Sequence, residues 1–399
     1  MAILKNITLI FVLCHGLLMG QSSMTPSGLS LKQYISNIEE NYPLVQRADN
    51  LIHQAKLNLK AQRGQYDPFI KADYNNKYYD GNNYYSVLNS EVKQPLFTSQ
   101  YLKAGYEFGD GIYLNPESKT SSYGLPFVGF EAALLQGMFF DKRRAGVLKA
   151  REYIDYGKAE RNEIVNDVLF NAINAYSELS FVNKQLTIYR YFIQLAQIRN
   201  NGISALAQIG EKPFIDTVEA SIIYQSRVLE LQALEIENRK KKASVNSFNW
   251  FQNGNTDLQF DFTPDSLDQL FEVYKTIMVR ELNIDSINNP IIQQYKIKQN
   301  ILKIDKRLKA EMIKPQLDVK YNFLTNDNGV FNPQLTSNNY RWGATLSFPL
   351  FLRTPRNEYK IAGLDVLNAK LETETKNNEL NNKINFTVKA LTVITEQIN

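Results

Sequence analysis

A heptad pattern of apolar residues marks the middle of the chain. Neither proline nor glycine interrupts it between Val165 and Ala196. Steps of three and four residues alternate, as in a coiled-coil helix. The stripe comprises Val165, Val168, Ala172, Ala175, Leu179, Val182, Leu186, Tyr189, Ile193 and Ala196. A helix over 143–201 is roughly 87 Å long at ~1.5 Å per residue, so we expect it to lie along other long helices.

A second long helix is predicted from Phe214 to about Phe248. Two apolar stripes run along it, which indicates two helical neighbours. One stripe has Ile215, Val218, Ile222, Leu229 and Ile236, and the other has Tyr224, Val228 and Leu231. The two helices would form a hairpin whose tip lies far from any sheet. Further helices are predicted over 31–63, 267–312 and 356–399.

Alternation with period two predicts strands in two regions. The clearest alternation covers 317–323 and 340–348. With their flanking residues the two strands are roughly ten residues each, which matches the ~9–11 residues that a tilted transmembrane strand needs. In the first half, 70–79 alternates similarly. Either 84–94 or 127–135 could be the strand that returns to the long helix, and 96–126 is predicted to be rich in loops.

In a transmembrane barrel the apolar side of such strands contacts lipid. The residues expected there are Tyr74, Val319, Tyr321, Phe323, Trp342, Leu346 and Phe348. Aromatic residues at strand ends fit an interfacial girdle or ordinary strand propensity, and the sequence leaves both open. These are Tyr78, Tyr79, Tyr84, Tyr85, Tyr340 and Trp342.

The order helix, strand hairpin, long helix occurs twice. At an offset of 247 residues, Asn41-Tyr42-Pro43 matches Asn288-Asn289-Pro290, whereas Arg144 matches Arg356 at an offset of 212. The first hairpin region is therefore longer by 35 residues (247 − 212). We predict a first repeat over 21–264 and a second over 265–399. The second lacks a counterpart of 188–250, so we expect it to be truncated before its last helix.

The scarcity of cysteine and histidine limits the kinds of site that the chain can form. Residues 1–20 have the Lys5 charge, apolar run and small Gly20 of a secretory signal peptide. Cleavage would remove the lone cysteine, Cys14, and leave one histidine, His53. Disulfides, thiol chemistry and histidine-rich metal sites are then excluded. The net charge of +4 gives no reason to expect nucleic acid.

The sequence contains no phosphate loop, nucleophile elbow or metal-ligand spacing. We therefore assign no catalytic, cofactor-binding or metal residue and do not expect an enzyme. The basic run 239–242 could bind acidic lipid headgroups. A solvated helix end that complements the helix dipole explains it equally simply.

Four predicted strands cannot close a barrel alone, because they leave two edges whose backbone groups lipid cannot satisfy. Closure requires several copies in a symmetric ring. The predicted fold class is therefore an α+β membrane protein. It combines long coiled-coil helices with a transmembrane β-barrel and two repeats per protomer, closed by several copies. The family resemblance described next implies that the helices also form a barrel and that closure is as a trimer.

The chain resembles the TolC-type family of outer-membrane efflux proteins. The likeness rests on an Asn-x-Pro motif that occurs twice, on prolines before strands, on the sequence at 349–351 and on Gly210 followed by Asp216. The motifs are Asn41-x-Pro43 and Asn288-x-Pro290, and the prolines are Pro68 and Pro315. It implies a homotrimer with a twelve-stranded barrel in outer-membrane lipid and a helical tunnel in the periplasm. The partners would be a periplasmic adaptor protein and an inner-membrane pump. The function would be passive export of drugs, small molecules or polypeptides.

The resemblance makes the helical tip an adaptor contact, with Gly202, Gly210, Pro213 and Asp216 as its candidate residues. A simpler interpretation is that proline and an acidic residue merely start the second helix. From another functional class, a structural coiled-coil trimer of the cell envelope without a pore is the alternative. The alternating strands argue against it, because their two faces differ in polarity.

Overall fold

The computed structural model describes residues 27–97, 99–250, 262–280, 289–325 and 335–398. Its contacts divide the chain into two units. The first comprises Met1–Gln46 and Val165–Asn283, and the second comprises Arg47–Ile164 and Ile284–Asn399. Each unit therefore combines segments from both halves of the sequence. The predicted signal peptide, 1–20, lies outside the described residues.

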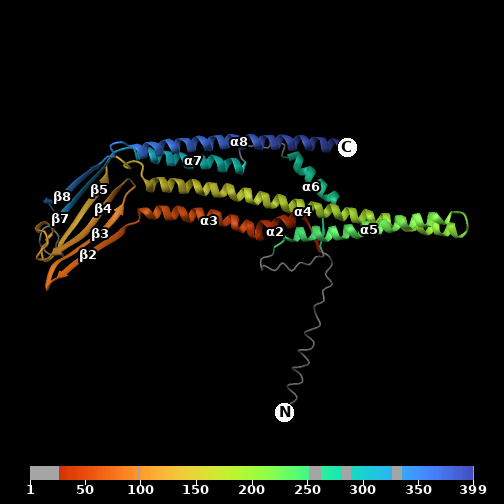
Figure 1. Cartoon of the computed structure of the whole chain (residues 1–399), viewed down its shortest axis with the longest axis horizontal. Helices are drawn as coiled ribbons and strands as arrows, with labels where there is room; N and C mark the ends of the chain where they lie inside the picture. The colour runs from red at the N-terminus through yellow and green to blue at the C-terminus, as the bar shows by residue number, and fades with distance from the viewer. Residues whose placement is uncertain (1–26, 98, 251–261, 281–288, 326–334, 399) are drawn as a thin grey trace, which may run out of the picture. The chain divides into compact units, whose positions relative to one another are not determined.

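Six strands of the second unit form one antiparallel sheet (Figure 1). The strands are β2 (Phe69–Tyr79), β3 (Asn82–Pro95), β4 (Gln100–Asp110), β5 (Leu125–Ala133), β7 (Gln316–Thr325) and β8 (Leu335–Ser347). Their spatial order is β2-β3-β4-β5-β7-β8. The two halves of the sequence join at β5 and β7, where Phe130 pairs with Tyr321. A single sheet thus contains strands that are almost two hundred residues apart.

The expectation of four strands, with loops over 96–126, is wrong. Strand β4 occupies part of that segment, and both candidate returning strands exist, as β3 and β5. In β4, Leu102, Ala104 and Tyr106 alternate with Lys103 and other polar or glycine positions. The glycines at 105 and 109 obscure this alternation, because glycine is normally unfavourable inside a strand.

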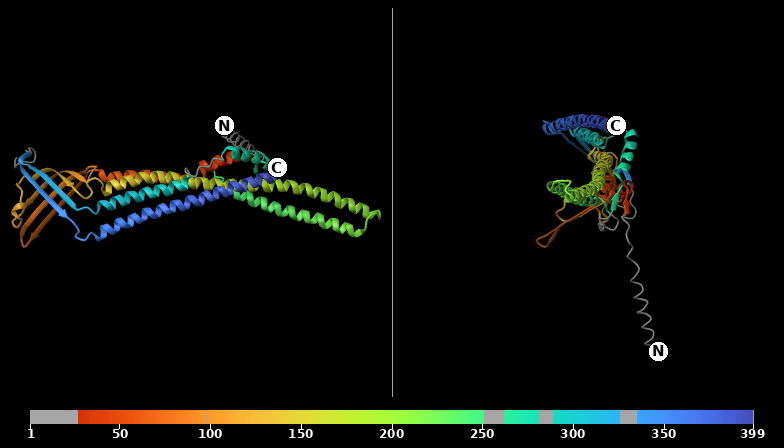
Figure 2. Two further views of the ribbon diagram at one scale, coloured as in Figure 1. Left: turned by 90° about the horizontal axis from the view of Figure 1, so that it is seen from above. Right: turned by 90° about the vertical axis from the view of Figure 1, so that its right-hand side faces the viewer.

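Four helical segments continue from this sheet within the second unit. They are most of α3 (Pro43–Arg63), the first part of α4 (Lys142–Gln208), α7 (Pro290–Glu311) and α8 (Arg353–Ile398). Helix α7 runs along α8 (Figures 1 and 2). Ion pairs link neighbouring helices. Helix α4 is joined to α3 by Arg161 and Asp49 at 2.7 Å, and to α7 by Lys149 and Asp305 at 2.8 Å. Helix α7 is joined to α8 by Lys309 and Glu358 at 2.7 Å.

The first unit contains α2 (Leu31–Asn41), the rest of α4, α5 (Phe214–Asn246), α6 (Leu267–Arg280) and the short parallel pair β1 (Ser27–Leu29) and β6 (Phe262–Pro264). Residues 267–312, predicted as one helix, form α6 and α7, with 281–288 outside the described residues. Helices α4 and α5 form the predicted hairpin (Figure 2). The heptad stripe is buried from Val165 to Leu186 and half-buried beyond, as expected for a coiled-coil contact.

Two tyrosines form the buried centre of the first unit. The rings of Tyr34 and Tyr176 stack with centroids 5.4 Å apart, and both residues are fully buried. The Tyr34 hydroxyl donates to the Val245 carbonyl at 3.1 Å. The Tyr176 hydroxyl accepts from the Asp265 amide at 2.8 Å and donates to the Leu29 carbonyl. Burial raises the pKa of both phenols, so they stay neutral and able to donate.

Removal of the Tyr176 hydroxyl tests its role in the buried tyrosine pair. Tyr176→Phe removes the partner of a partly buried amide and a partly buried carbonyl, and we expect it to lower the free energy of unfolding by about 1–2 kcal/mol. Tyr191→Phe, at an exposed position of the same helix, is the matched control and should change little. Denaturant unfolding followed by circular dichroism measures both variants. Equal effects would contradict the role given to Tyr176.

Candidate functional site: a sheet with one apolar and one charged face

The strand register places most of the apolar side chains of the six strands on one face of the sheet. Directly paired residues project to the same side, so the pairs define the face. They include Ile70 with Val92, Leu88 with Phe108, Leu102 with Phe130, Val128 with Phe323, and Tyr321 with Trp342. Much of this apolar face is open: Ile70 is 78% exposed, Leu346 68% and Trp342 63%.

The opposite face carries the charges. By the same register it contains Lys71, Asp73, Glu91, Lys93, Lys103, Glu107, Glu131, Asp318, Lys320 and Arg341. Several polar side chains on this charged face are more buried than the apolar ones opposite, with Lys103 only 7% and Asn322 only 8% exposed. This distribution is the reverse of that in a water-soluble sheet, where the apolar face is covered and the polar face is wet.

Glu131 is the centre of the charged face. Its carboxylate lies 3.3 Å from the Nζ atom of Lys103, 3.6 Å from that of Lys93 and 4.0 Å from that of Lys320. These lysines lie on β4, β3 and β7, so one carboxylate on β5 pairs with lysines of three other strands. Opposite charges around Glu131 are needed because a partly buried charge without a partner destabilises the fold.

Arg341 and Glu107 show that the sheet curls toward the charged face. The guanidinium on β8 forms a bidentate pair with the carboxylate on β4, with one N–O distance of 3.0 Å. Strands β5 and β7 lie between them. At ~4.8 Å per strand, a flat sheet would separate β4 and β8 by ~14 Å. Side chains standing perpendicular to a flat sheet would not meet over that distance, so the charged face is concave.

Glycine makes room on the concave side. A Cβ atom at Gly105 would lie 2.5 Å from the Phe127 ring, and one at Gly129 would lie 2.2 Å from the Asn322 side chain. Phe127 itself is buried across β4. Gly105 on β4 and Gly129 on β5 therefore allow neighbouring side chains to pack closely on the concave face.

Six of the seven predicted lipid-facing residues lie on the apolar face: Tyr74, Val319, Tyr321, Phe323, Trp342 and Leu346. The seventh, Phe348, follows the end of β8 and is exposed. Their contact with lipid stays a prediction. The sequence did not indicate the shared register, because β5 and β7 are joined only in the folded sheet.

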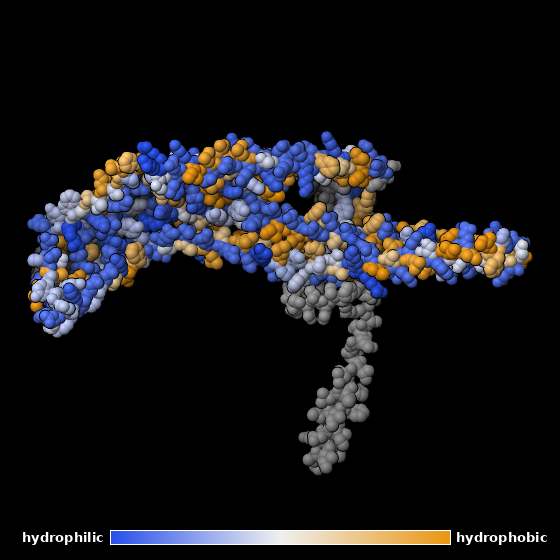
Figure 3. Space-filling view, in the orientation of Figure 1, coloured by the Kyte–Doolittle hydropathy of each residue, from blue (hydrophilic) through white to orange (hydrophobic). Residues whose placement is uncertain are grey.

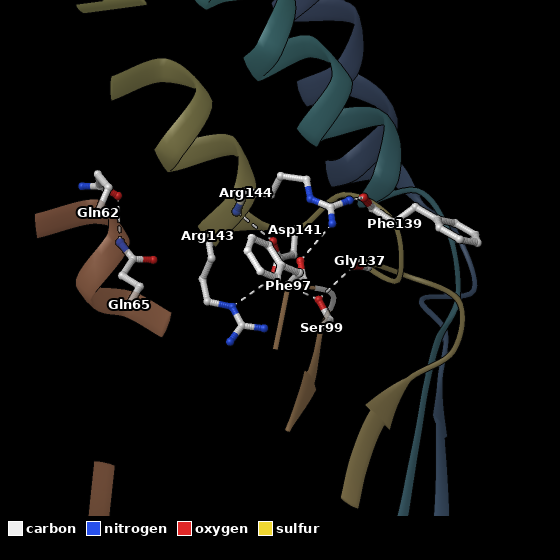
Figure 4. A network of polar contacts seen from close by, with 9 residues as sticks. All are labelled: Gln62, Gln65, Phe97, Ser99, Gly137, Phe139, Asp141, Arg143 and Arg144. Carbon is white, nitrogen blue, oxygen red and sulfur yellow. Dashed lines mark hydrogen bonds and ion pairs between the residues drawn. The ribbon is translucent and has the colours of Figure 1, made fainter. Parts of the chain in front are cut away.

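Asp141 organises the junction between the sheet and helix α4 (Figure 4). It caps the helix by accepting from the Arg144 amide at 2.9 Å, and it pairs with Nε of Arg143 at 3.0 Å. The Ser99 hydroxyl lies 3.2 Å from the same carboxylate and donates to the Gly137 carbonyl at 2.8 Å. One half-buried carboxylate thus connects the helix start to the turns that precede β4 and follow β5.

The two arginines extend the same network. Arg144 donates to the carbonyls of Phe97, at 2.9 Å, and Phe139. The guanidinium of Arg143 lies 4.8 Å from the ring centroid of Tyr101 and 5.3 Å from that of Tyr66, at cation–π distance. These contacts rigidly couple the first turn of α4 to the base of the sheet.

The predicted tip residues do not all fall in the turn. Gly202 lies inside α4, which ends at Gln208 rather than near 201, because a single glycine costs a helix only about 1 kcal/mol. Gly210 has a φ of +81°, the left-handed conformation that ends helices. Pro213 precedes α5, and Asp216 lies in its first turn, 3.6 Å from Lys212. Adaptor contact stays a prediction for all four.

The hairpin carries exposed apolar stripes in addition to the buried one. On α5 the stripe Ile215, Val218, Ile222, Leu229 and Ile236 is exposed. Figure 3 shows apolar patches on the surface of the α4–α5 hairpin. On α4, Phe181, Ile188, Tyr191, Leu195 and Ile198 repeat the heptad steps on another side of the helix and are also exposed. This second α4 stripe was missed, although its spacing could have revealed it. Such stripes are the contact surfaces of coiled coils.

Within the described residues, no group of three or more histidine, cysteine, aspartate or glutamate side chains has the arrangement to hold a metal ion. The helices described here also include none that is both long enough and apolar enough to span a membrane.

No protein-family model and no curated protein matches the chain. Solved structures do match it. VceC, an outer membrane protein of Vibrio cholerae, has a TM-score of 0.61 and 12% identity over 92% of this chain and 80% of its own. The outer-membrane channel OprN has a TM-score of 0.60 and 12% identity, over 92% of this chain and 76% of its own. The CmeC channel of Campylobacter jejuni has a TM-score of 0.57 and 10% identity, over 87% of this chain and 67% of its own. The chain therefore has the fold of TolC-type outer-membrane channels, and the predicted fold class of long helices combined with a β-sheet is confirmed.

The junction is tested by removing its carboxylate. Asp141→Ala should lower the free energy of unfolding by about 2 kcal/mol, because it removes a helix cap and the acceptor of several partly buried donors. Asp155→Ala, at an exposed i,i+3 pair of α4, is the control and should cost under about 0.5 kcal/mol. Urea unfolding of the detergent-solubilised protein measures the difference. A loss at position 141 no larger than the control would refute the capping role.

Proposed function

We propose that this chain is the outer-membrane component of an export system and acts as a passive conduit. The observation that carries the proposal is the curled sheet with an open apolar face and a concave charged face. Lipid suits the apolar side, and a water-filled lumen suits the charged side. Passive conduction needs no catalytic group, and none is assigned.

Closure of the conduit requires further copies of the chain. The sheet ends in β2 on one side and β8 on the other, and unpaired strand edges are not tolerated in the hydrocarbon region. The exposed apolar stripes of α4 and α5 would likewise be covered by helices of neighbouring copies. A homotrimer satisfies both requirements with one symmetry operation, and the fold it shares with outer-membrane channels supports this arrangement.

The remaining parts of the proposal follow from this placement. With the sheet in the cell outer membrane, the helices extend into the periplasm. The turn around Gly210, Pro213 and Asp216 is then the surface offered to a periplasmic adaptor, which links the conduit to an inner-membrane pump. The cargo is either small molecules such as drugs or secreted polypeptides. A polar lumen with both signs of charge admits either class.

A structural coiled-coil trimer without a pore would leave the apolar face exposed to water. Extraction distinguishes the two functions. A pore protein should stay with membranes after salt and alkaline washing and come off only with detergent, whereas an envelope stalk without a barrel should wash off.

Conductance tests the pore directly. We expect the purified full chain to produce discrete, long-lived current steps in planar lipid bilayers. Val319→Lys places a charge on the apolar face of β7, which costs about 2–4 kcal/mol near the bilayer midplane, and should abolish the steps. Thr345→Lys, on the charged face of β8, should keep them. Absence of steps from correctly assembled wild-type protein would overturn the proposal.

A further inference from the structure

The β3–β4 hairpin has no counterpart in the second half of the chain. By the offset of 247, the first residue of β2 corresponds to the first residue of β7 (69 + 247 = 316). By the offset of 212, β5 corresponds to the part of β8 that leads into the last helix (133 + 212 = 345). Strand β7 continues directly into β8 in spatial order, whereas β3 and β4 stand between β2 and β5. The 35 extra residues are thus largely a strand hairpin.

We propose that this hairpin is part of the membrane-spanning wall, so that each copy contributes six strands rather than four. Three copies then close an eighteen-stranded barrel (3 × 6) in place of the twelve strands that the resemblance implies. The inference rests on the proposed channel function and concerns how its wall is built.

Hydrogen bonding makes the hairpin a member of the wall. Strand β3 pairs with β2 from Asn82 to Lys93, and with β4 from Ser86 to Pro95. Strand β4 pairs in turn with β5, from Gln100 to Glu107. If the hairpin folded outside the wall, β2 and β5 would have to be direct neighbours. The hydrogen bonds of β2 with β3 and of β4 with β5 would then be lost.

The two-faced pattern also continues through the hairpin without a break. Leu88 and Leu102 lie on the apolar face, while Lys93, Lys103 and Glu107 lie on the charged face. Lys103 pairs with Glu131 on β5, and Glu107 pairs with Arg341 on β8. The hairpin therefore meets the requirements of a transmembrane segment on both sides, and its charges are neutralised by strands of both repeats. At 14 and 11 residues, β3 and β4 are long enough to cross a bilayer.

Strand direction permits the wider ring. All neighbours in the sheet are antiparallel, so with six strands β2 and β8 run in opposite directions. The β8 edge of one copy can then pair with the β2 edge of the next and continue the alternation. A single inserted strand would have made that junction parallel, whereas an inserted hairpin preserves it.

The added strands enlarge the lumen. With ~4.8 Å between strands and a tilt of ~40°, eighteen strands give a backbone diameter of roughly 36 Å, against roughly 24 Å for twelve. The cross-section more than doubles. The barrel would therefore pass bulkier polar cargo than a twelve-stranded wall of the same tilt.

Lipid contact of the hairpin is the test. Single cysteines are introduced into full-length protein carrying Cys14→Ser, labelled with a bimane fluorophore, and reconstituted in phosphatidylcholine vesicles with or without brominated acyl chains. Leu88→Cys and Leu102→Cys report the apolar face of the hairpin, and Asn89→Cys reports its charged face. Trp342→Cys and Thr345→Cys are the matched controls on β8.

We expect brominated lipid to quench positions 88 and 102 as strongly as 342, and at least about threefold more than 89 and 345. Aqueous iodide should show the opposite preference. Quenching at 342 without quenching at 88 and 102 would overturn the six-strand wall while leaving the channel intact. No lipid quenching at any position would overturn the channel itself. Native mass spectrometry should find three copies, and two copies would refute the count of eighteen.

Discussion

An exposed apolar face backed by a concave charged face is the constraint on which the rest of this structure depends. In water such a sheet would be unstable, because its apolar side gains nothing from folding while Lys103 and Asn322 are desolvated. The arrangement is stable when lipid covers the convex side and the charges neutralise each other across the concave side. The Glu131 cluster and the pair of Arg341 with Glu107 supply that neutralisation.

The helices meet the same kind of constraint. A single chain buries one heptad stripe of α4 and leaves a second stripe exposed, together with one on α5. The sheet has two free edges for the same reason. Strand edges and apolar helix faces are both surfaces that a further copy of the chain can cover. The interactions that are missing within one protomer are therefore those that assembly would provide, and the Asp141 junction joins the sheet to α4 within each copy.

Sequence patterns predicted the parts of this fold that depend on local periodicity. The heptad stripe of α4 and the alternation along β7 and β8 are visible because each residue's neighbours in sequence are also its neighbours on a face. Strand β4 was missed because its concave side uses glycine at 105 and 109, where a sequence pattern indicates a turn. The end of α4 was misplaced because Gly202 sits within the helix and Gly210 supplies the left-handed turn.

Contacts between distant segments could not be predicted. Arg341 and Glu107 are 234 residues apart, and nothing in either neighbourhood identifies the other. Nor does local sequence reveal that Tyr176 binds Leu29 and Asp265, because those contacts exist only once three segments have assembled. The resemblance between the repeats indicated an insertion of 35 residues, but only the strand register shows where it lies. Periodicity indicates which face a residue occupies, whereas topology decides which residue it meets there.

Electron cryomicroscopy of the full chain in lipid nanodiscs would show where the sheet lies relative to the lipid. We expect a closed antiparallel wall in the lipid layer. In that wall β8 of each copy is hydrogen-bonded to β2 of the next, with the apolar face toward the acyl chains and the Glu131 cluster toward a water-filled lumen. A sheet located outside the lipid layer, or a wall whose charged face is turned toward the acyl chains, would contradict it.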